Sequence, residues 1–308
     1  MPIFLGIDAG GTKTTCAVAN ETSVLATATS GASNIVRVGE TEARASLREA
    51  IAKACSSAGV DRRGVERTVI GAAGASVPQV RSRLLETICG MVSGEVEVVG
   101  DMVIAMEAAF EGAEGVIVIA GTGSIAYGRT AQGETARAGG WGYAISDEGS
   151  GHWIGRRTVS AALSGHDNGS DALLARVLRA WNLSSMDELI RMANASPPPD
   201  FAQLFPLAIE LLGSTCSGSI YRIFDEAGQE LAKLAASVVH RLWTEQTQIT
   251  VASVGGVFAH APLVKKSFQT AMQKAWPWVT IRQDIVDPVY GAVWRARRSA
   301  ASSTPEAS

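Results

Sequence analysis

The sequence contains few cysteines, and they are not arranged as a metal or disulfide motif. Only 4 of the 308 residues are cysteine, and no CxxC pair occurs. Zinc sites and disulfide frameworks need cysteines at close or regular spacing. We therefore expect Cys16, Cys55, Cys89 and Cys216 to be small core residues of a protein in a reducing compartment.

The chain also lacks a stripe of basic residues and a long apolar segment. It carries 27 basic and 30 acidic residues and a net charge of −3, which argues against nucleic acid as a partner. No segment reaches the roughly 18 consecutive apolar residues of a membrane-spanning helix. The N-terminus enters a predicted strand without the basic and apolar regions of a signal peptide. We expect a cytoplasmic protein with no membrane partner.

A P-loop is absent as well, but another segment offers a way to hold phosphate. No GxxxxGK[ST] sequence occurs, whereas residues 8–14 read DAGGTKT and lie between two short apolar segments. The adjacent Gly10 and Gly11 permit a turn whose backbone N–H groups approach a ligand closely. The carboxylate of Asp8 suits a magnesium ion that carries the phosphate. An ordinary hairpin turn would show the same pattern.

A similar arrangement occurs again about 110 residues further along the chain. The first copy has predicted strands at 3–7, 14–19 and 24–29, and the second has them at 116–120, 125–129 and 134–138. In the second copy the turn is Gly121-Thr122-Gly123-Ser124, where the hydroxyl of Thr122 suits a terminal phosphate. The duplication predicts two similar α/β domains with a cleft between them.

The rest of the sequence alternates between helical and strand patterns. Apolar spacing predicts helices at 41–57, 77–91, 102–110, 150–163, 171–181, 186–194, 201–212, 220–243, 262–275 and 290–298. Further strands are predicted at 67–71, 95–99, 249–253 and 279–282. The small and polar residues at 299–308 predict a disordered tail.

Asp101 is our candidate catalytic base. It follows the strand at 95–99 and stands at the start of a predicted helix. Ligands of open α/β sheets bind at the carboxyl ends of strands. An aspartate at this position also serves as a helix cap, and capping does not exclude catalysis.

A region rich in glycine and polar residues follows the second copy, and it reads GGWG at 139–142 and DEGSG at 147–151. The face of Trp141 suits stacking on a sugar ring, and a structural tryptophan is the alternative. Asp147 and Glu148 suit hydrogen bonds to sugar hydroxyls or the capping of the next helix. His152 is interpreted as structural.

A last glycine pair, Gly255-Gly256, follows the predicted strand at 249–253. It would let an adenine ring approach the backbone, and a plain strand-to-helix turn is the alternative reading.

Together these motifs resemble the superfamily of sugar kinases, actin and heat-shock chaperone ATPases. Within it the chain is similar to the branch of N-acetylglucosamine kinases, bacterial glucosamine kinases and BadF/BadG-type ATPases. The resemblance covers roughly residues 3–298 and rests on DAGGTKT (8–14), SN (33–34), GD (100–101), GTGS (121–124), GGWG (139–142) and DEGSG (147–151). The GGWG and DEGSG pair is the most discriminating part.

The resemblance implies an α/β fold of two actin-like (ribonuclease H-like) domains, related by duplication, with an interdomain cleft. It implies an N-terminal domain at 1–113, completed by a C-terminal helix at 288–298, and a larger domain at 114–287. ATP and Mg²⁺ are the implied cofactors, an amino sugar is the implied partner, and a homodimer is the implied assembly.

The resemblance also implies roles for individual residues. Asp8 would organise magnesium, and Asp101 would be the base that faces the acceptor hydroxyl of the bound sugar. The nucleotide would be contacted by Gly10, Gly11, Thr12, Lys13, Gly121, Thr122, Gly123, Gly255 and Gly256. The sugar would be bound, in addition to Asp101, by Asn34, Ser124, Ile125, Gly140, Trp141, Gly142 and Asp147.

The implied activity is transfer of the γ-phosphate of ATP to the 6-hydroxyl of N-acetylglucosamine or a close relative. A glucosamine-specific kinase, a BadF-type ATPase that acts on a protein partner, and a sugar sensor without turnover stay open. No cysteine precedes the turn at 119–123, unlike in activators that bridge an iron–sulfur cluster, so we do not expect an electron-transfer activator. The cysteine-rich motif of zinc-dependent sugar kinases is also missing.

Overall fold

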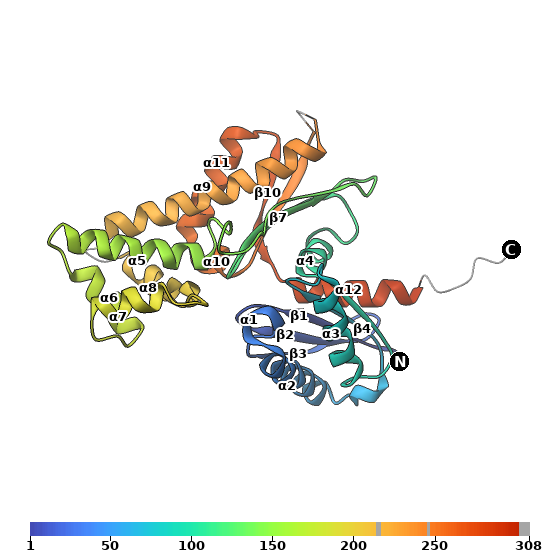
Figure 1. The fold of residues 1–308 in the computed structure, drawn as a ribbon. Helices are drawn as coiled ribbons and strands as arrows, with labels where there is room; N and C mark the ends of the chain where they lie inside the picture. Colours follow the sequence, from blue (N-terminus) through green and yellow to red (C-terminus); the bar gives the residue numbers. More distant parts are fainter. Residues whose placement is uncertain (214–216, 245–246, 302–308) are drawn as a thin grey trace. The chain divides into compact units, whose positions relative to one another are not determined.

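The structure, a computed structural model, describes residues 1–213, 217–244 and 247–301 and divides into two compact units (Figure 1). Unit 1 consists of Met1–Ala113 and the chain from Val286 onward, and unit 2 consists of Glu114–Ile285. Each unit is built around one five-stranded sheet that mixes parallel and antiparallel strands.

The sheet of unit 1 has the strand order β3-β2-β1-β4-β5. Its antiparallel half consists of β1 (Ile3–Ala9), β2 (Thr14–Ala19) and β3 (Val24–Ser30). The parallel half adds β4 (Val65–Ala72) beside β1 and then β5 (Glu95–Gly100). The short turns between β1, β2 and β3 allow only antiparallel neighbours, whereas helices connect the parallel strands.

Helices cover both faces of this sheet. Alternate residues of a strand point to opposite faces, and the buried side chains divide accordingly. Leu5 and Ile7 of β1 pack with α2 (Glu40–Ala58) and α3 (Pro78–Cys89). Phe4, on the other face, packs with α4 (Asp101–Phe110) and α12 (Pro288–Ala301).

Glycines allow α4 to approach its neighbours closely. A Cβ atom on Gly71 of β4 would lie 2.3 Å from Cδ1 of Ile104, and one on Gly291 of α12 would lie 1.8 Å from the carbonyl oxygen of Ile104. Larger residues at either position would push α4 away. The helix that begins with Asp101 is therefore held between β4 and α12.

The sheet of unit 2 repeats the same order, β10-β9-β6-β7-β8 when read from the other edge. Its antiparallel half consists of β6 (Gly115–Ala120), β7 (Ser124–Arg129) and β8 (Thr135–Gly139). The other neighbours are β9 (Ile249–Val254), which is parallel to β6, and β10 (Val279–Val286). This repetition confirms the duplication expected from the sequence.

Helices of unit 2 are inserted mainly between β8 and β9. They are α5 (Gly151–Asp167), α6 (Ala172–Ala180), α7 (Met186–Ala193), α8 (Phe205–Leu211), α9 (Ser217–Leu242), α10 (Gly256–His260) and α11 (Pro262–Ala275). The long α9 packs on the sheet, where Gly128 of β7 leaves room for Val238, and α11 lies alongside α9 (Figure 1).

Several elements differ from the sequence prediction. The helix expected at 201–212 is divided into a 3₁₀ helix, Phe201–Leu204, and α8, because Pro206 fits the first turn of a helix but not its interior. Short helices at Ile35–Val38 (α1) and Arg62–Gly64 were not predicted. Residues 299–301 belong to α12 and not to a disordered tail, while residues 302–308 lie outside the described residues.

The cysteine prediction holds for two residues and is wrong for one. Cys16 and Cys55 are buried, whereas Cys89 is exposed. The buried stripe of α3 consists of Leu84, Thr87 and Ile88, and Cys89 falls outside this stripe. Cys216 lies outside the described residues. Within the part of the chain that is described, no helix has both the length and the apolar character of a membrane span.

Candidate active site

The first glycine turn joins β1 to β2 and is closed by its own backbone. The N–H of Gly10 donates a 3.1 Å hydrogen bond to the carbonyl oxygen of Lys13. A Cβ atom on Gly10 would lie 2.7 Å from that oxygen, so no larger residue fits without a shift of the turn. Thr12 and Lys13 are exposed at its tip, where Gly11 is half-buried. These are the residues that the sequence assigns to phosphate.

A buried hydroxyl pair ties this turn to the segment that carries Asn34. The hydroxyls of Thr14 and Ser33 lie 2.6 Å apart, and the N–H of Ser33 donates a 3.1 Å hydrogen bond to the carbonyl oxygen of Gly10. The carbonyl oxygen of Asn34 then accepts the N–H of Arg37 and opens α1. Asn34 is thus held near the first turn. The sequence analysis identified Asn34 but not the hydroxyl pair that positions it.

Two carboxylates lie where strands of the unit 1 sheet end. Asp8 is near the end of β1, and Asp101 follows the last residue of β5. Burial, together with the charges of Asp101 and Asp287, raises the pKa of Asp8 to about 7. Burial also raises the pKa of Asp101, although a 2.9 Å hydrogen bond from the N–H of Met102 opposes this shift. The site therefore concentrates negative charge in a partly buried place.

Asp101 occupies the first position of α4, and Gly100 is the residue that caps the helix. The carboxylate accepts the N–H of the next residue, Met102, and that of Asp101 itself. It does not form the side-chain bond of an N-cap to the second or third residue of a helix. The helix-cap interpretation of Asp101 is therefore wrong in its usual form.

The second glycine turn joins β6 to β7 in unit 2. It is closed by a 3.0 Å hydrogen bond from the N–H of Gly121 to the carbonyl oxygen of Gly123. The first residues of α5 bind the same turn, because the N–H of Gly151 donates to Gly121 and the N–H of His152 donates to Thr122. The turn is therefore fixed to a helix N-terminus.

Gly255 lies directly against this second turn. It adopts a φ of 100°, which favours glycine, and a Cβ atom would lie 2.5 Å from the carbonyl oxygen of Ala120 and 3.2 Å from the N–H nitrogen of Gly121. Gly256 is the first residue of α10. The close backbone approach explains why this position holds a glycine, and it brings Gly255 together with the predicted phosphate turn.

Four predicted sugar residues also meet in unit 2. The N–H of Ser124 donates a 3.3 Å hydrogen bond to Oδ1 of Asp147, and its hydroxyl donates a 2.7 Å hydrogen bond to the carbonyl oxygen of Glu148. The backbone of Gly140, at a φ of 70°, passes over the side chain of Ile125, since a Cβ atom there would lie 2.7 Å from Cδ1 of Ile125. Ser124, Ile125, Gly140 and Asp147 are thus brought together by β7 and the loop after β8.

Asp147 has an unusual backbone and a perturbed carboxyl. Its φ is 71°, which a residue other than glycine rarely adopts, and its side chain is buried. Burial raises the pKa of Asp147, the hydrogen bond from Ser124 opposes this shift, and the charge of Glu148 adds to it. Strained residues gather at functional sites when the surrounding structure holds them in place.

Trp141 is not a core residue. It is 60% exposed, and the guanidinium carbon of Arg137 lies 4.0 Å from the centroid of its ring. Gly142 follows at a φ of 95°, and no described atom lies near the place of its missing Cβ. Its exposure argues against the structural alternative, and the stacking of Trp141 on a sugar ring stays a prediction.

The interpretation of His152 as structural agrees with its surroundings. Its ring is buried and lies 5.0 Å from that of Tyr143 and 5.2 Å from that of Phe201. This stacking connects the loop after β8 to the helical part of unit 2.

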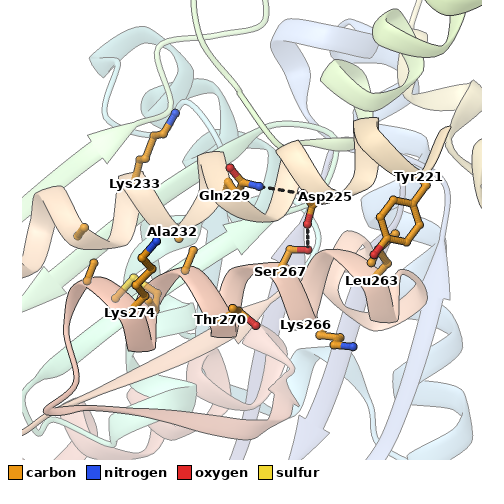
Figure 2. A pocket seen from close by; sticks show the side chains of 14 residues that line it. Tyr221, Asp225, Gln229, Ala232, Lys233, Leu263, Lys266, Ser267, Thr270 and Lys274 are labelled. Atoms are coloured by element: carbon orange, nitrogen blue, oxygen red, sulfur yellow. Dashed lines mark hydrogen bonds between the residues drawn. The ribbon is translucent and has the colours of Figure 1, made fainter. Parts of the chain in front are cut away.

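A groove resolved in unit 2 lies elsewhere. It has a volume of about 470 Å³ and is lined by residues of α9 and α11 only (Figure 2). On its floor Asp225 accepts hydrogen bonds from Ser267 and from Gln229, the latter at 2.9 Å. None of the predicted site residues lines this groove, so it is not part of the candidate active site.

The duplicated sheets, each with a glycine turn between its first two strands, define a fold of actin-like architecture. The structure of the ROK hexokinase of Thermus thermophilus shares this fold, with a TM-score of 0.57 and 16% identity over 97% of this chain and 99% of the hexokinase. The chain belongs to the BadF/BadG/BcrA/BcrD ATPase family, whose sequence profile matches residues 5–194.

Two curated relatives match the chain over nearly its whole length. The N-acetylmuramic acid/N-acetylglucosamine kinase of Clostridium acetobutylicum is 31% identical over 303 residues, which cover 96% of this chain and 99% of the relative. The N-acetyl-D-glucosamine kinase of Dictyostelium discoideum is 30% identical over 318 residues, with 96% and 98% covered. A candidate N-acetylglucosamine kinase of Chromobacterium violaceum shares the fold, with a TM-score of 0.76 and 23% identity over 95% of this chain and 98% of that structure.

Proposed function

We propose that this protein is an ATP-dependent amino sugar kinase that transfers the γ-phosphate of ATP to the 6-hydroxyl of N-acetylglucosamine or a close relative. The observation that carries the proposal is the cluster in unit 2, where Ser124, Ile125, Gly140 and Asp147 meet beside the second glycine turn. Both curated relatives are named as kinases of N-acetylated amino sugars. Their near-complete coverage supports the same class of activity for this chain.

The two glycine turns would contact the phosphates of ATP. Each is closed by its own backbone and therefore keeps its shape without a ligand. Thr12 and Lys13 on the first turn, and Thr122 on the second, offer hydroxyl and ammonium donors. Phosphoryl transfer depends mainly on positioning and on charge stabilisation, which such preformed turns provide. Gly255, which lies against the second turn, would line the path toward the adenosine.

Asp8 is suited to hold Mg²⁺ together with the phosphates. No group of three or more histidine, cysteine, aspartate or glutamate side chains that could hold a metal ion is found among the described residues. Proteins usually bind Mg²⁺ through one or two carboxylates plus substrate phosphates, so one carboxylate is sufficient here. Burial, and after it the charges of Asp101 and Asp287, raise the pKa of Asp8, and a bound cation would favour its charged form. When bound, Mg²⁺ would neutralise charge on the phosphoryl group.

Asp101 would take the proton of the acceptor hydroxyl. Its carboxyl lies at the carboxyl end of β5, where α/β sheets present catalytic groups. Burial raises its pKa, which makes the carboxylate a stronger base than an exposed aspartate. Asn34 of unit 1, and Ser124, Trp141 and Asp147 of unit 2, are the further residues that would contact the sugar.

A coupled ADP-release assay over a panel of N-acetylglucosamine, glucosamine, N-acetylmuramic acid and glucose tests the proposal. Sugar-dependent ADP release, with one sugar phosphate formed per ADP, is the expected result. Equal ADP release with and without sugar would instead support an ATPase that acts on a protein partner. Sugar binding without any turnover would support a sensor.

The proposal includes a homodimer in the cytoplasm, as the family resemblance implies. Light scattering during size-exclusion chromatography tests the assembly, and a monomer at assay concentration would remove it from the proposal.

A further inference from the structure

Arg137 lies beside the aromatic platform of the candidate sugar site. It belongs to β8, where it pairs with Tyr127, and Gly139 two residues later pairs with Ile125. Paired residues of neighbouring strands share a face of the sheet. Arg137, Tyr127 and Ile125 therefore lie on the half-buried face, opposite the face where Gly128 contacts α9. The side chain of Arg137 then reaches Trp141, with 4.0 Å between the guanidinium carbon and the ring centroid.

The charge of Arg137 is not neutralised by the part of the protein that the structure describes. Its guanidinium contacts the Trp141 ring, and no carboxylate of a described residue forms an ion pair with it. Arg157 offers a contrast within the same unit. It lies 5.4 Å from the ring centroid of Trp153, but it also forms a 2.6 Å ion pair with Glu226. Arg157 is thus a surface arginine with a partner, whereas Arg137 keeps a positive charge available.

The two carboxylates of the loop after β8 already have partners. Asp147 accepts the N–H of Ser124, and Glu148 accepts the hydroxyl of Ser146 at 3.5 Å. A ligand that brought its own carboxylate would therefore find an unpaired guanidinium next to the tryptophan. Guanidinium groups bind carboxylates through two parallel hydrogen bonds, which are stronger than bonds between neutral groups.

We propose that Arg137 selects amino sugars that carry a carboxylate, such as the 3-O-lactyl group of N-acetylmuramic acid. This inference rests on the proposed function, because it takes Trp141 and Asp147 to meet the sugar. The sign of the charge orders the substrates: a carboxylate is attracted, the neutral N-acetylglucosamine is not, and the ammonium group of glucosamine is repelled. The Clostridium acetobutylicum relative is named for both N-acetylmuramic acid and N-acetylglucosamine, which agrees with this substrate class.

The test compares wild type, Arg137→Gln and Arg137→Lys on the three sugars, with Arg157→Gln as the matched control. Arg137→Gln is expected to lower the ratio of kcat/KM for N-acetylmuramic acid to that for N-acetylglucosamine by about tenfold. It is expected to raise the corresponding ratio for glucosamine. Arg137→Lys keeps the positive charge but loses the paired N–H donors of the guanidinium. Its kcat/KM ratios should therefore lie between those of wild type and Arg137→Gln. Arg157→Gln should leave all ratios as in wild type.

The outcomes separate this inference from the proposed function. If wild type phosphorylates N-acetylglucosamine and Arg137→Gln has the same kcat/KM ratios between sugars as wild type, the inference is overturned and the proposed function is not. Equal loss of activity on all three sugars in Arg137→Gln would assign Arg137 a structural role and also overturn it. Calorimetric titration with N-acetylmuramic acid gives a second readout, since weaker binding to Arg137→Gln than to wild type is expected even without turnover. A wild-type enzyme that phosphorylates no sugar would contradict the proposed function itself.

Discussion

Ser124 and Asp147 are 23 residues apart in sequence, and the N–H of Ser124 donates a 3.3 Å hydrogen bond to Oδ1 of Asp147. The hydroxyl of Ser124 extends the contact to the carbonyl oxygen of Glu148. One residue of β7 thus holds the end of the loop that follows β8. Because Ser124 directly follows Gly123, the second glycine turn and the loop after β8 are joined by these hydrogen bonds.

Replacing Asp147 separates its charge from its structural role. The variant Asp147→Asn keeps a side-chain oxygen for Ser124, and asparagine tolerates a positive φ, so the melting temperature should stay near that of wild type. The lost charge should raise the KM for sugar by about tenfold, while the KM for ATP changes little. Asp147→Ala loses the acceptor as well and should lower the free energy of unfolding by roughly 1–3 kcal/mol. Steady-state kinetics and thermal denaturation measure both effects.

Glu111→Ala provides the control for backbone strain. Glu111 has a φ of 49° at the end of α4 and is exposed. Alanine leaves the strain at this φ unchanged, so both the melting temperature and the KM for sugar should stay near those of wild type. A wild-type KM for sugar in Asp147→Asn would contradict the role given to the carboxylate.

Two glycines of the second turn should affect different substrates. A Cβ atom on Gly123 would lie 2.9 Å from Oδ2 of Asp147, whereas one on Gly121 would meet no described atom within 4 Å. Gly123→Ala should displace Asp147 and raise the KM for sugar by roughly tenfold, which corresponds to about 1.4 kcal/mol. Gly121→Ala adds a methyl group to the open side of the turn and should raise the KM for ATP instead. Separate titrations of the two substrates check this division, and the same pattern in both variants would refute it.

The duplicated sheet and its turns were predictable because their signals are local. Short apolar segments flanked by glycine and hydroxyl residues predict the strands β1, β2, β6 and β7 directly. The position of Asp101 after an apolar strand is what made it the candidate catalytic base. The contacts of Ser33 with Thr14, and of Arg137 with Trp141, were not predictable in this way. The first depends on a buried hydroxyl pair, and the second on the register between β7 and β8 and on positive φ angles in the loop.

Electrostatic interactions between residues far apart in the sequence were also not predictable from it. Asp287 lies just before α12, far from Asp8 in the sequence, and yet its charge contributes to the raised pKa of Asp8. The packing of α12 on β1 brings the two together, and no local pattern reports such packing. The exposed position of Cys89 also depends on which face of α3 meets the sheet.

Asp101→Asn tests the catalytic base. The amide oxygen of asparagine still accepts the N–H of Met102, so α4 should begin as in wild type. Without a proton acceptor, kcat should fall by a factor of roughly 10²–10⁴, while the KM for sugar stays close to the wild-type value. In wild type, kcat should fall with decreasing pH as Asp101 becomes protonated. This fall should occur at a higher pH than for an exposed aspartate, because burial raises the pKa of Asp101. The residual kcat of Asp101→Asn should not show this pH dependence.

Asp61→Asn is the matched control for this substitution. Asp61 also accepts a backbone N–H near a helix start, from Arg63 at 2.9 Å, but it is exposed and distant from the strand ends. Its kcat should equal that of wild type. If Asp101→Asn turned over at the rate of Asp61→Asn, another group would have to be the base.

The pH dependence of stability tests the electrostatic origin of the Asp8 shift. The pKa of Asp8 is about 7 in the folded protein and near 3.8 in the unfolded chain. Between these values the folded state holds a proton that the unfolded state has released, so the stability contributed by this group falls as pH rises. Asp8→Asn carries no charge to bury. It should therefore be more stable than wild type at pH 8, on the order of 2 kcal/mol after allowance for partial exposure, and equal to wild type near pH 4.

Chemical denaturation of wild type and Asp8→Asn from pH 4 to pH 8 measures the difference in their free energies of unfolding. The variant Asp287→Asn should have an intermediate effect. Removing the charge of Asp287 should lower the pKa of Asp8 part of the way, while asparagine still accepts the N–H of Val289 at the start of α12. The gain in stability at pH 8 should then lie between those of wild type and Asp8→Asn. Mg²⁺ with ATP should raise the melting temperature of wild type more than that of Asp8→Asn, because the variant lacks the carboxylate that holds the ion. A constant difference between wild type and Asp8→Asn from pH 4 to pH 8 would show that packing, and not charge, governs this position.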